Sequence, residues 1–250
     1  MRAVLAVLAV LAAALTAPAA AAAPPTASTT PSASVAAADG CYTWSDTLEE
    51  GSSGDAVRQL QIRVAGYADY GAELALDGEY GANTKQAVAR FQDAYGLSSN
   101  GVADSATFEQ IYKLQDDDCT PANFDYAELN KCNSDWSGGA VSASQAKANA
   151  LVTMWKLQAL RHALGDEPLT ISSGFRSKAC NDAAGGSSSS RHLYGDAADL
   201  TGVHSFCTMA KGARNRGFSE ILGPGYPGHD DHVHVAHDPS PYWDAPTCGI

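Results

Sequence analysis

The pattern that most restricts the fold is a set of histidine and aspartate residues in two separate segments. The first segment holds His192 and Asp199, and the second holds Asp231, His232 and His234. Two neutral imidazoles and one carboxylate suit a zinc ion and leave its fourth position open for water, which is typical of a catalytic site. A fold that uses this set must bring the two segments together, with a spare carboxylate near the water to accept its proton.

The second segment has the alternating pattern of a strand. Extended backbone would send His232 and His234 to one face and the valines between them to the other. Asp231 would then lie where the strand begins, and it reaches the water only if the backbone turns there. Gly228, shortly upstream, allows such a turn.

The ligand set has an alternative reading. A different set uses three histidines of the second segment: His229, His232 and His237. It would leave His192 and Asp199 without a role, so we predict one zinc ion per chain on His192, Asp199 and His234. Copper and iron remain open on ligand type alone. Gly195 lies between the first two candidate metal ligands, and without a side chain it is expected to let the backbone come close to a bound ligand.

The start of the chain predicts export. Arg2 precedes an apolar run over residues 4–15, followed by an alanine-rich stretch with Ala-x-Ala sites. This is the pattern of a secretory signal peptide, and its apolar core is too short for a stable membrane span. We assign residues 1–38 to the signal peptide and a possible short pro-segment, and expect no membrane association after its removal.

Six cysteines in an exported chain predict three disulfides. Many pairings are possible, and no C-x-x-C spacing favours a zinc ribbon or a redox site. The pairing that we predict is Cys41–Cys119, Cys132–Cys180 and Cys207–Cys248.

The formal net charge of −12 restricts the partners. An acidic protein is repelled by nucleic acid and by anionic membranes, so we expect neither as a partner. A phosphate-rich cell wall would repel it as well, and wall binding would therefore need a specific pocket. We expect a monomer.

Residues from about 47 to 115 read as three short helices separated by glycine turns, carrying Val57 to Val64, Val88 to Phe91, and Phe108 to Leu114 on their apolar faces. An internal echo supports a duplicated unit, because Gly78 to Thr84 and Gly101 to Thr107 share the same spacing before a helix.

The segment resembles the peptidoglycan-binding three-helix module of bacterial wall hydrolases. The matching residues are Gly51 to Gln61, Asp77 to Gly81, Thr84, Ala87, Val88, Phe91 and Gln92. A bundle that only spaces the enzyme from the wall is the alternative.

Three aspartates, Asp116 to Asp118, and the nearby Pro121 predict a domain boundary near residue 119. We therefore expect a helical module over 39–118 and a second domain over 119–250. The second domain has a long helical pattern up to Gly165, then strand patterns at Leu169 to Ser172 and around the candidate ligands. The mixture indicates an α+β fold, here expected to have an antiparallel sheet.

The second domain is similar to the zinc D-alanyl-D-alanine carboxypeptidases, above all to secreted actinobacterial ones that carry the wall-binding module. The resemblance rests on Ser-x-His-x-x-Gly-x-Ala-x-Asp from Ser190, on Asp-His-x-His from Asp231, and on Ser-Gly-Phe-Arg-Ser at 173–177. It implies zinc on the three ligands named above, Asp231 as general base, and Arg176 and His232 as polar groups that address the substrate. Ser190 could contact the substrate, support a ligand, or simply end the serine-rich loop.

The expected activity is hydrolysis of the C-terminal D-Ala-D-Ala bond of peptidoglycan stem peptides by a secreted enzyme associated with the cell wall. Arg176 suits this substrate, because a guanidinium can grip a carboxylate through two hydrogen bonds. Cleavage of peptide cross-links by the same machinery is an alternative, and a non-catalytic wall-binding protein is another. A serine hydrolase is excluded because the chain has no Gly-x-Ser-x-Gly motif.

Overall fold

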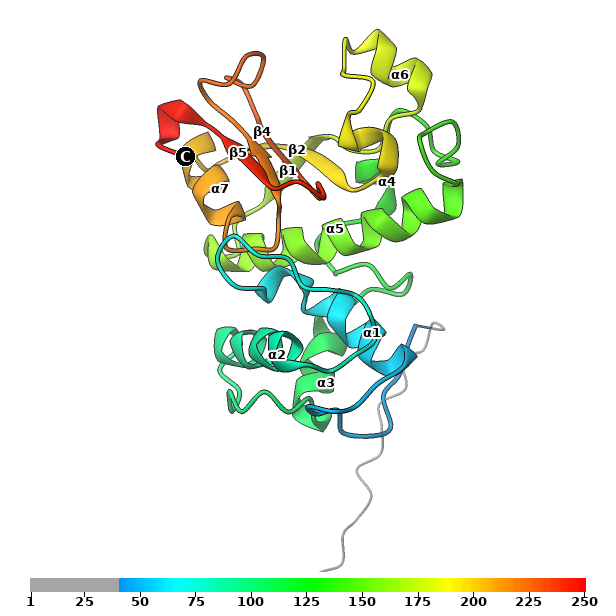
Figure 1. Ribbon diagram of the computed structural model, residues 1–250, viewed down its shortest axis with the longest axis vertical. Coiled ribbons are helices and arrows are strands. Elements are labelled where there is room, and N and C mark those ends of the chain that lie inside the picture. The colour runs from blue at the N-terminus through cyan, green and yellow to red at the C-terminus, as the bar shows by residue number, and fades with distance from the viewer. Residues whose placement is uncertain (1–40) are drawn as a thin grey trace, which may run out of the picture. The chain divides into compact units, whose positions relative to one another are not determined.

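The computed structural model describes residues 41–250, so the predicted signal segment 1–38 lies outside the described residues. Figure 1 shows helices and a single sheet in an α+β arrangement. The α-helices are α1 (Asp55–Arg63), α2 (Ala82–Ala94), α3 (Ser105–Leu114), α4 (Tyr126–Leu129), α5 (Ala143–Ala163), α6 (Lys178–Ala183) and α7 (Phe206–Ala213). Short 3-10 helices are η1 (Ala65–Tyr67), η2 (Arg191–Tyr194) and η3 (Pro246–Cys248). Within 41–250, no helix combines the length and the apolar character needed to cross a bilayer.

Helices α1, α2 and α3 form where the sequence predicted three helices, and their apolar faces share one hydrophobic cluster. The internal echo has a structural basis in two buried glutamines. Gln61 accepts from the backbone N–H of Gly78 and donates to Thr84 Oγ1, and Gln92 makes the same two bonds with Gly101 and Thr107. Each glutamine thus ties a glycine turn to the first turn of the following helix, which satisfies backbone groups that would otherwise be buried without partners.

Helix α5 contributes to both hydrophobic clusters of the described chain. Met154, Leu157 and Leu160 pack in the cluster that includes the sheet. Trp155 and Ala159 pack in the cluster of α1, α2 and α3. The helix is buried on two sides because its sequence is apolar on both, as expected for a helix between two packed layers.

The five-stranded sheet has the order β1-β2-β4-β3-β5. The strands are β1 (Leu169–Ser173), β2 (Ala197–Gly202), β3 (Glu220–Leu222), β4 (Val233–Ala236) and β5 (Tyr242–Asp244). The pairs β1/β2, β2/β4 and β3/β4 are antiparallel, whereas β3 and β5 are parallel. The expectation of an antiparallel sheet was therefore wrong at this edge. After β4 the chain crosses β3 and adds the three-residue β5 on its far side, running in the direction of β3.

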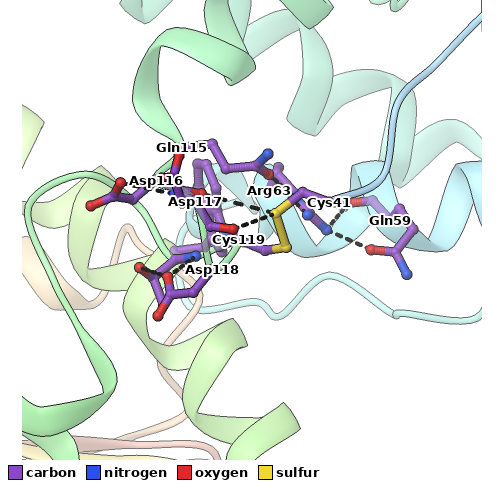
Figure 2. The surroundings of a disulfide bond; sticks show 10 residues. Cys41, Gln59, Arg63, Gln115, Asp116, Asp117, Asp118 and Cys119 are labelled. Atoms are coloured by element: carbon purple, nitrogen blue, oxygen red, sulfur yellow. Dashed lines mark hydrogen bonds between the residues drawn. A yellow bond between two sulfur atoms is a disulfide. The ribbon is translucent and has the colours of Figure 1, made fainter. Parts of the chain in front are cut away.

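The three disulfides are those predicted: Cys41–Cys119, Cys132–Cys180 and Cys207–Cys248. Figure 2 shows Cys41–Cys119 beside Arg63, a buried side chain whose guanidinium donates to Gln59 and Gln115. Cys41–Cys119 closes the part of the chain that holds α1, α2 and α3, which we call the helical segment (residues 41–118). The other two disulfides lie in the part that holds the sheet.

Candidate metal centre

Strand pairing brings two of the predicted ligands together. Asp199 of β2 and His234 of β4 are direct partners in the antiparallel register, so both side chains lie on the same face of the sheet. Their contact is short, with 2.9 Å between Asp199 Oδ1 and His234 Nδ1. The strand pattern predicted the face of His234, but which strand would be its neighbour followed only from the fold.

His192 reaches the same point from η2. Its Nε2 lies 3.1 Å from Asp199 Oδ1 and 3.1 Å from His234 Nδ1. Its Nδ1 lies 2.6 Å from the carbonyl oxygen of Gly174, an acceptor only, so Nδ1 carries the proton and Nε2 keeps its lone pair. Gly174 permits this placement because a side chain there would collide with the backbone of Leu129.

The turn after His192 packs closely against helix α5. Gly195 has a positive φ of 77°, and a Cβ on it would come within 2.3 Å of the carbonyl oxygen of Ala146. The glycine therefore lets η2 approach helix α5, a packing role that the sequence analysis did not predict.

One potential ligand atom from each of His192, Asp199 and His234 lies within 4.8 Å of the others, and all three residues are buried. We call these residues the ligand cluster. Burial alone would raise the pKa of Asp199, but its contacts with the imidazoles of His192 and His234 hold that pKa well below its usual range. Burial lowers the pKa of His192, which favours the neutral imidazole that binds metals.

The cluster has more acceptors than protons. Asp199 is ionised and His192 Nε2 has a lone pair, so at most one proton, on His234 Nδ1, can lie in the three-way contact. A divalent cation would satisfy all three atoms at once. The donor set of two imidazoles and a carboxylate therefore fits zinc.

The alternative ligand set is not brought together. His237 points elsewhere, with its Nδ1 2.5 Å from Glu73 of the helical segment. Among residues 41–250, the only group with metal-ligand geometry is the ligand cluster.

A cavity of about 550 Å³ opens onto the cluster, and the other predicted site residues Arg176, Ser190 and His232 line it. Arg176 Nη2 donates to Asp199 Oδ2 at 2.7 Å, and its Nε donates to Ser173 at 3.0 Å. Arg176 is therefore also the ion-pair partner of a buried carboxylate. Ser190 precedes η2 on the cavity wall, which leaves its role as predicted, open between substrate and support.

Asp231 lies at the bend before β4, as the sequence required, but it does not face the ligand cluster directly. Its side chain is 91% exposed, and Oδ1 lies 2.8 Å from His232 Nδ1. The other ring nitrogen of His232 is 3.8 Å from Asp199 Oδ1. The hydrogen bond from His232 lowers the pKa of Asp231, so this carboxylate is ionised at neutral pH.

Sequence reasoning missed Glu220 of β3, whose side chain also lines the cavity. Burial raises the pKa of its carboxyl group. No motif singles out this residue, because its position beside His234 depends on the pairing of β3 with β4.

Comparisons with known proteins agree with this site. Residues 122–236 match the model of the Peptidase M15 family, and residues 53–111 match a putative peptidoglycan binding domain. The chain is 68% identical over 217 residues to the zinc D-Ala-D-Ala carboxypeptidase of Streptomyces albus G. The aligned residues make up 86% of this chain and 85% of that protein.

Proposed function

Since the chain belongs to the peptidase M15 family, we propose that it is a zinc D-Ala-D-Ala carboxypeptidase that acts on peptidoglycan. The observation that carries this function is the ligand cluster, three buried metal-ligand atoms within 4.8 Å of one another at the floor of the cavity. A wall peptidase needs both features: a site that holds a metal, and open space for a peptide beside it.

His192 Nε2, Asp199 Oδ1 and His234 Nδ1 are the atoms that would hold the zinc ion. When bound, zinc supplies a Lewis acid that polarises a carbonyl oxygen and lowers the pKa of water to about 7. The chain keeps these ligands in place through Gly174, which fixes the tautomer of His192, and through Arg176, which neutralises the second oxygen of Asp199.

His232 and Asp231 act as a pair in proton transfer. The Nε2 of His232 faces the cluster, where it accepts a proton from the attacking water and later delivers one to the leaving amine. Asp231 bonds the opposite ring nitrogen, orients the imidazole, and stabilises the positive charge that forms on it. Asp231 thus supplies basicity to the reaction through the ring of His232, whereas the sequence resemblance implied that Asp231 itself takes the proton as general base.

Arg176 and Ser190 bind the end of the substrate. Arg176 lines the cavity with a guanidinium whose Nη1 has no hydrogen bond within the described chain, so its remaining N–H groups can receive the terminal carboxylate. Ser190, directly before η2, offers a hydroxyl from the wall of the same cavity.

The helical segment holds the enzyme on the wall. Residues 39–118 form the three-helix peptidoglycan-binding module and residues 119–250 form the catalytic domain. Binding of the module to the wall raises the effective concentration of stem peptides at the cavity. The protein acts outside the cell as a monomer, after loss of residues 1–38, and three disulfides suit that oxidising location.

A substrate panel tests the proposal. The mature protein is incubated with a peptide ending in D-Ala-D-Ala, with the same peptide ending in L-Ala-L-Ala, and with a cross-linked stem peptide. We expect release of D-alanine from the first alone. Cleavage of the cross-linked peptide alone would establish the endopeptidase alternative. Binding of all three peptides without cleavage of any would establish the alternative of a non-catalytic wall-binding protein.

A further inference from the structure

The two imidazoles of the ligand cluster present opposite ring nitrogens. His192 uses Nε2 and donates its other N–H to Gly174. His234 uses Nδ1, which leaves its Nε2–H on the outer side of the ring. Histidines that bind metals donate the outer N–H to a carboxylate, a carbonyl or water, and this bond fixes the tautomer.

The group that faces the outer nitrogen of His234 is the carboxylate of Glu220. Glu220 Oε1 lies 3.9 Å from His234 Nε2. The second oxygen, Oε2, is buried and has no hydrogen-bond partner within residues 41–250. A gap of 3.9 Å is one that a single water or a small rotation of either side chain closes.

The register of β3 and β4 explains why a glutamate reaches this nitrogen. Leu222 is the direct partner of His234, and Glu220 lies two residues away on the same face. A diagonal neighbour in an antiparallel pair is about 7–8 Å away between backbone positions, which a long side chain spans and a short one does not.

We propose that Glu220 is a positioning residue that accepts the Nε2–H of His234 and so keeps the Nδ1 lone pair directed at the metal. The inference rests on the proposed function, because it takes the ligand cluster to be a zinc site. A carboxylate acceptor also makes the imidazole a more basic ligand.

Glu220 carries a cost that supports this role. A buried carboxylate oxygen without a hydrogen bond destabilises a fold, and a leucine of similar volume would avoid that penalty. Glu220 should therefore weaken the metal-free protein and strengthen zinc binding, two effects in opposite directions that a merely structural residue would not produce.

The test measures zinc affinity by competition with a chromogenic chelator, and thermal unfolding of the metal-free protein, for Glu220→Leu and Glu220→Gln. We expect zinc affinity to fall about 10- to 100-fold in Glu220→Leu. Glu220→Gln keeps an acceptor oxygen and should lie between this variant and the wild type. The metal-free Tm of Glu220→Leu should equal or exceed that of the wild type. Glu167→Leu is the matched control, because Glu167 is exposed, lies outside the cavity and should leave zinc affinity unchanged.

Two results would overturn the inference. One is a Glu220→Leu variant that binds zinc as tightly as the wild type. The other is a weakened affinity accompanied by a lower metal-free Tm, which would indicate general damage to the fold. Failure of the proposed function looks different, because wild-type protein would then bind no stoichiometric zinc.

Discussion

Asp231 is hydrogen-bonded to His232, with 2.8 Å between Asp231 Oδ1 and His232 Nδ1, and the ring of His232 lies between this carboxylate and the ligand cluster. The relationship makes the two residues one functional unit. It also sets them apart from the ligand cluster, which contains neither residue.

We expect Asp231→Asn and His232→Ala each to retain zinc and to lower kcat about 10²- to 10⁴-fold, the usual contribution of a positioned proton-transfer group. The double variant should lose little more than the worse single one, because each change disables the same unit. Steady-state kinetics with metal analysis of each protein would check this. Multiplicative losses would mean that the two residues act independently, and loss of zinc in Asp231→Asn would mean that Asp231 is a ligand.

Arg176 is expected to recognise the terminal carboxylate while it supports Asp199. Arg176→Ala should lower kcat/KM about 10- to 100-fold, as expected for loss of charged hydrogen bonds. The wild type should discriminate strongly against a peptide with an amidated C-terminus, and the variant should discriminate far less. Arg176→Lys should not restore activity, because an ammonium cannot make the two-pronged contact.

Zinc affinity is the control for Arg176, since its guanidinium contacts the ligand Asp199 at 2.7 Å. If Arg176→Ala and the wild type discriminate equally against the peptide with an amidated C-terminus, a group other than Arg176 binds the terminal carboxylate.

Glu73 gives stability that depends on pH. Burial alone would raise its pKa, but the hydrogen bonds from His237 and Lys156 and their charges outweigh it and lower the pKa below the ordinary value of 4.5. A depressed pKa in the folded state means that the stabilisation is present above 4.5 and is lost as the pH falls through the folded value. Glu73→Gln should therefore lower the free energy of unfolding at neutral pH by about 1–3 kcal/mol.

Urea unfolding at neutral pH and at acidic pH would check this, with the exposed Glu167→Gln as control. The gap between wild type and Glu73→Gln should narrow below pH 4.5. A gap that stays constant with pH would show that the carboxylate charge is not what stabilises the contact.

Trp155 links the helical segment to α5. It is 1% exposed, packs in the cluster of α1, α2 and α3, and donates from its indole to the carbonyl of Cys119. Trp155→Ala should cost about 3–5 kcal/mol of unfolding free energy, the usual range for a large core side chain. Val203→Ala, at a 70% exposed position, should change it by less than about 0.5 kcal/mol. Similar small losses in both variants would contradict a packed junction.

The residues of the ligand cluster could be predicted from the sequence because they lie in short motifs. His192 and Asp199 are seven positions apart, and the alternation around His234 assigns it to a face. The three helices and the long α5 were predictable for a similar reason, since apolar periodicity is a local signal.

What the sequence did not predict depends on pairings between distant segments. The parallel β5, the contact of Glu220 with His234, and the packing of Gly195 against Ala146 each require knowledge of which element lies beside which. Asp231 was placed correctly at the strand entry, but its bond to His232 depends on side-chain rotation that no pattern of residue types specifies.

The most direct test of the central claim is the release of D-alanine from a peptide ending in D-Ala-D-Ala, measured before and after removal of metal. The account predicts that a chelator abolishes release and that one equivalent of zinc per chain restores it, while His234→Ala neither binds that zinc nor recovers. Release that continues unchanged in metal-free protein would contradict the account.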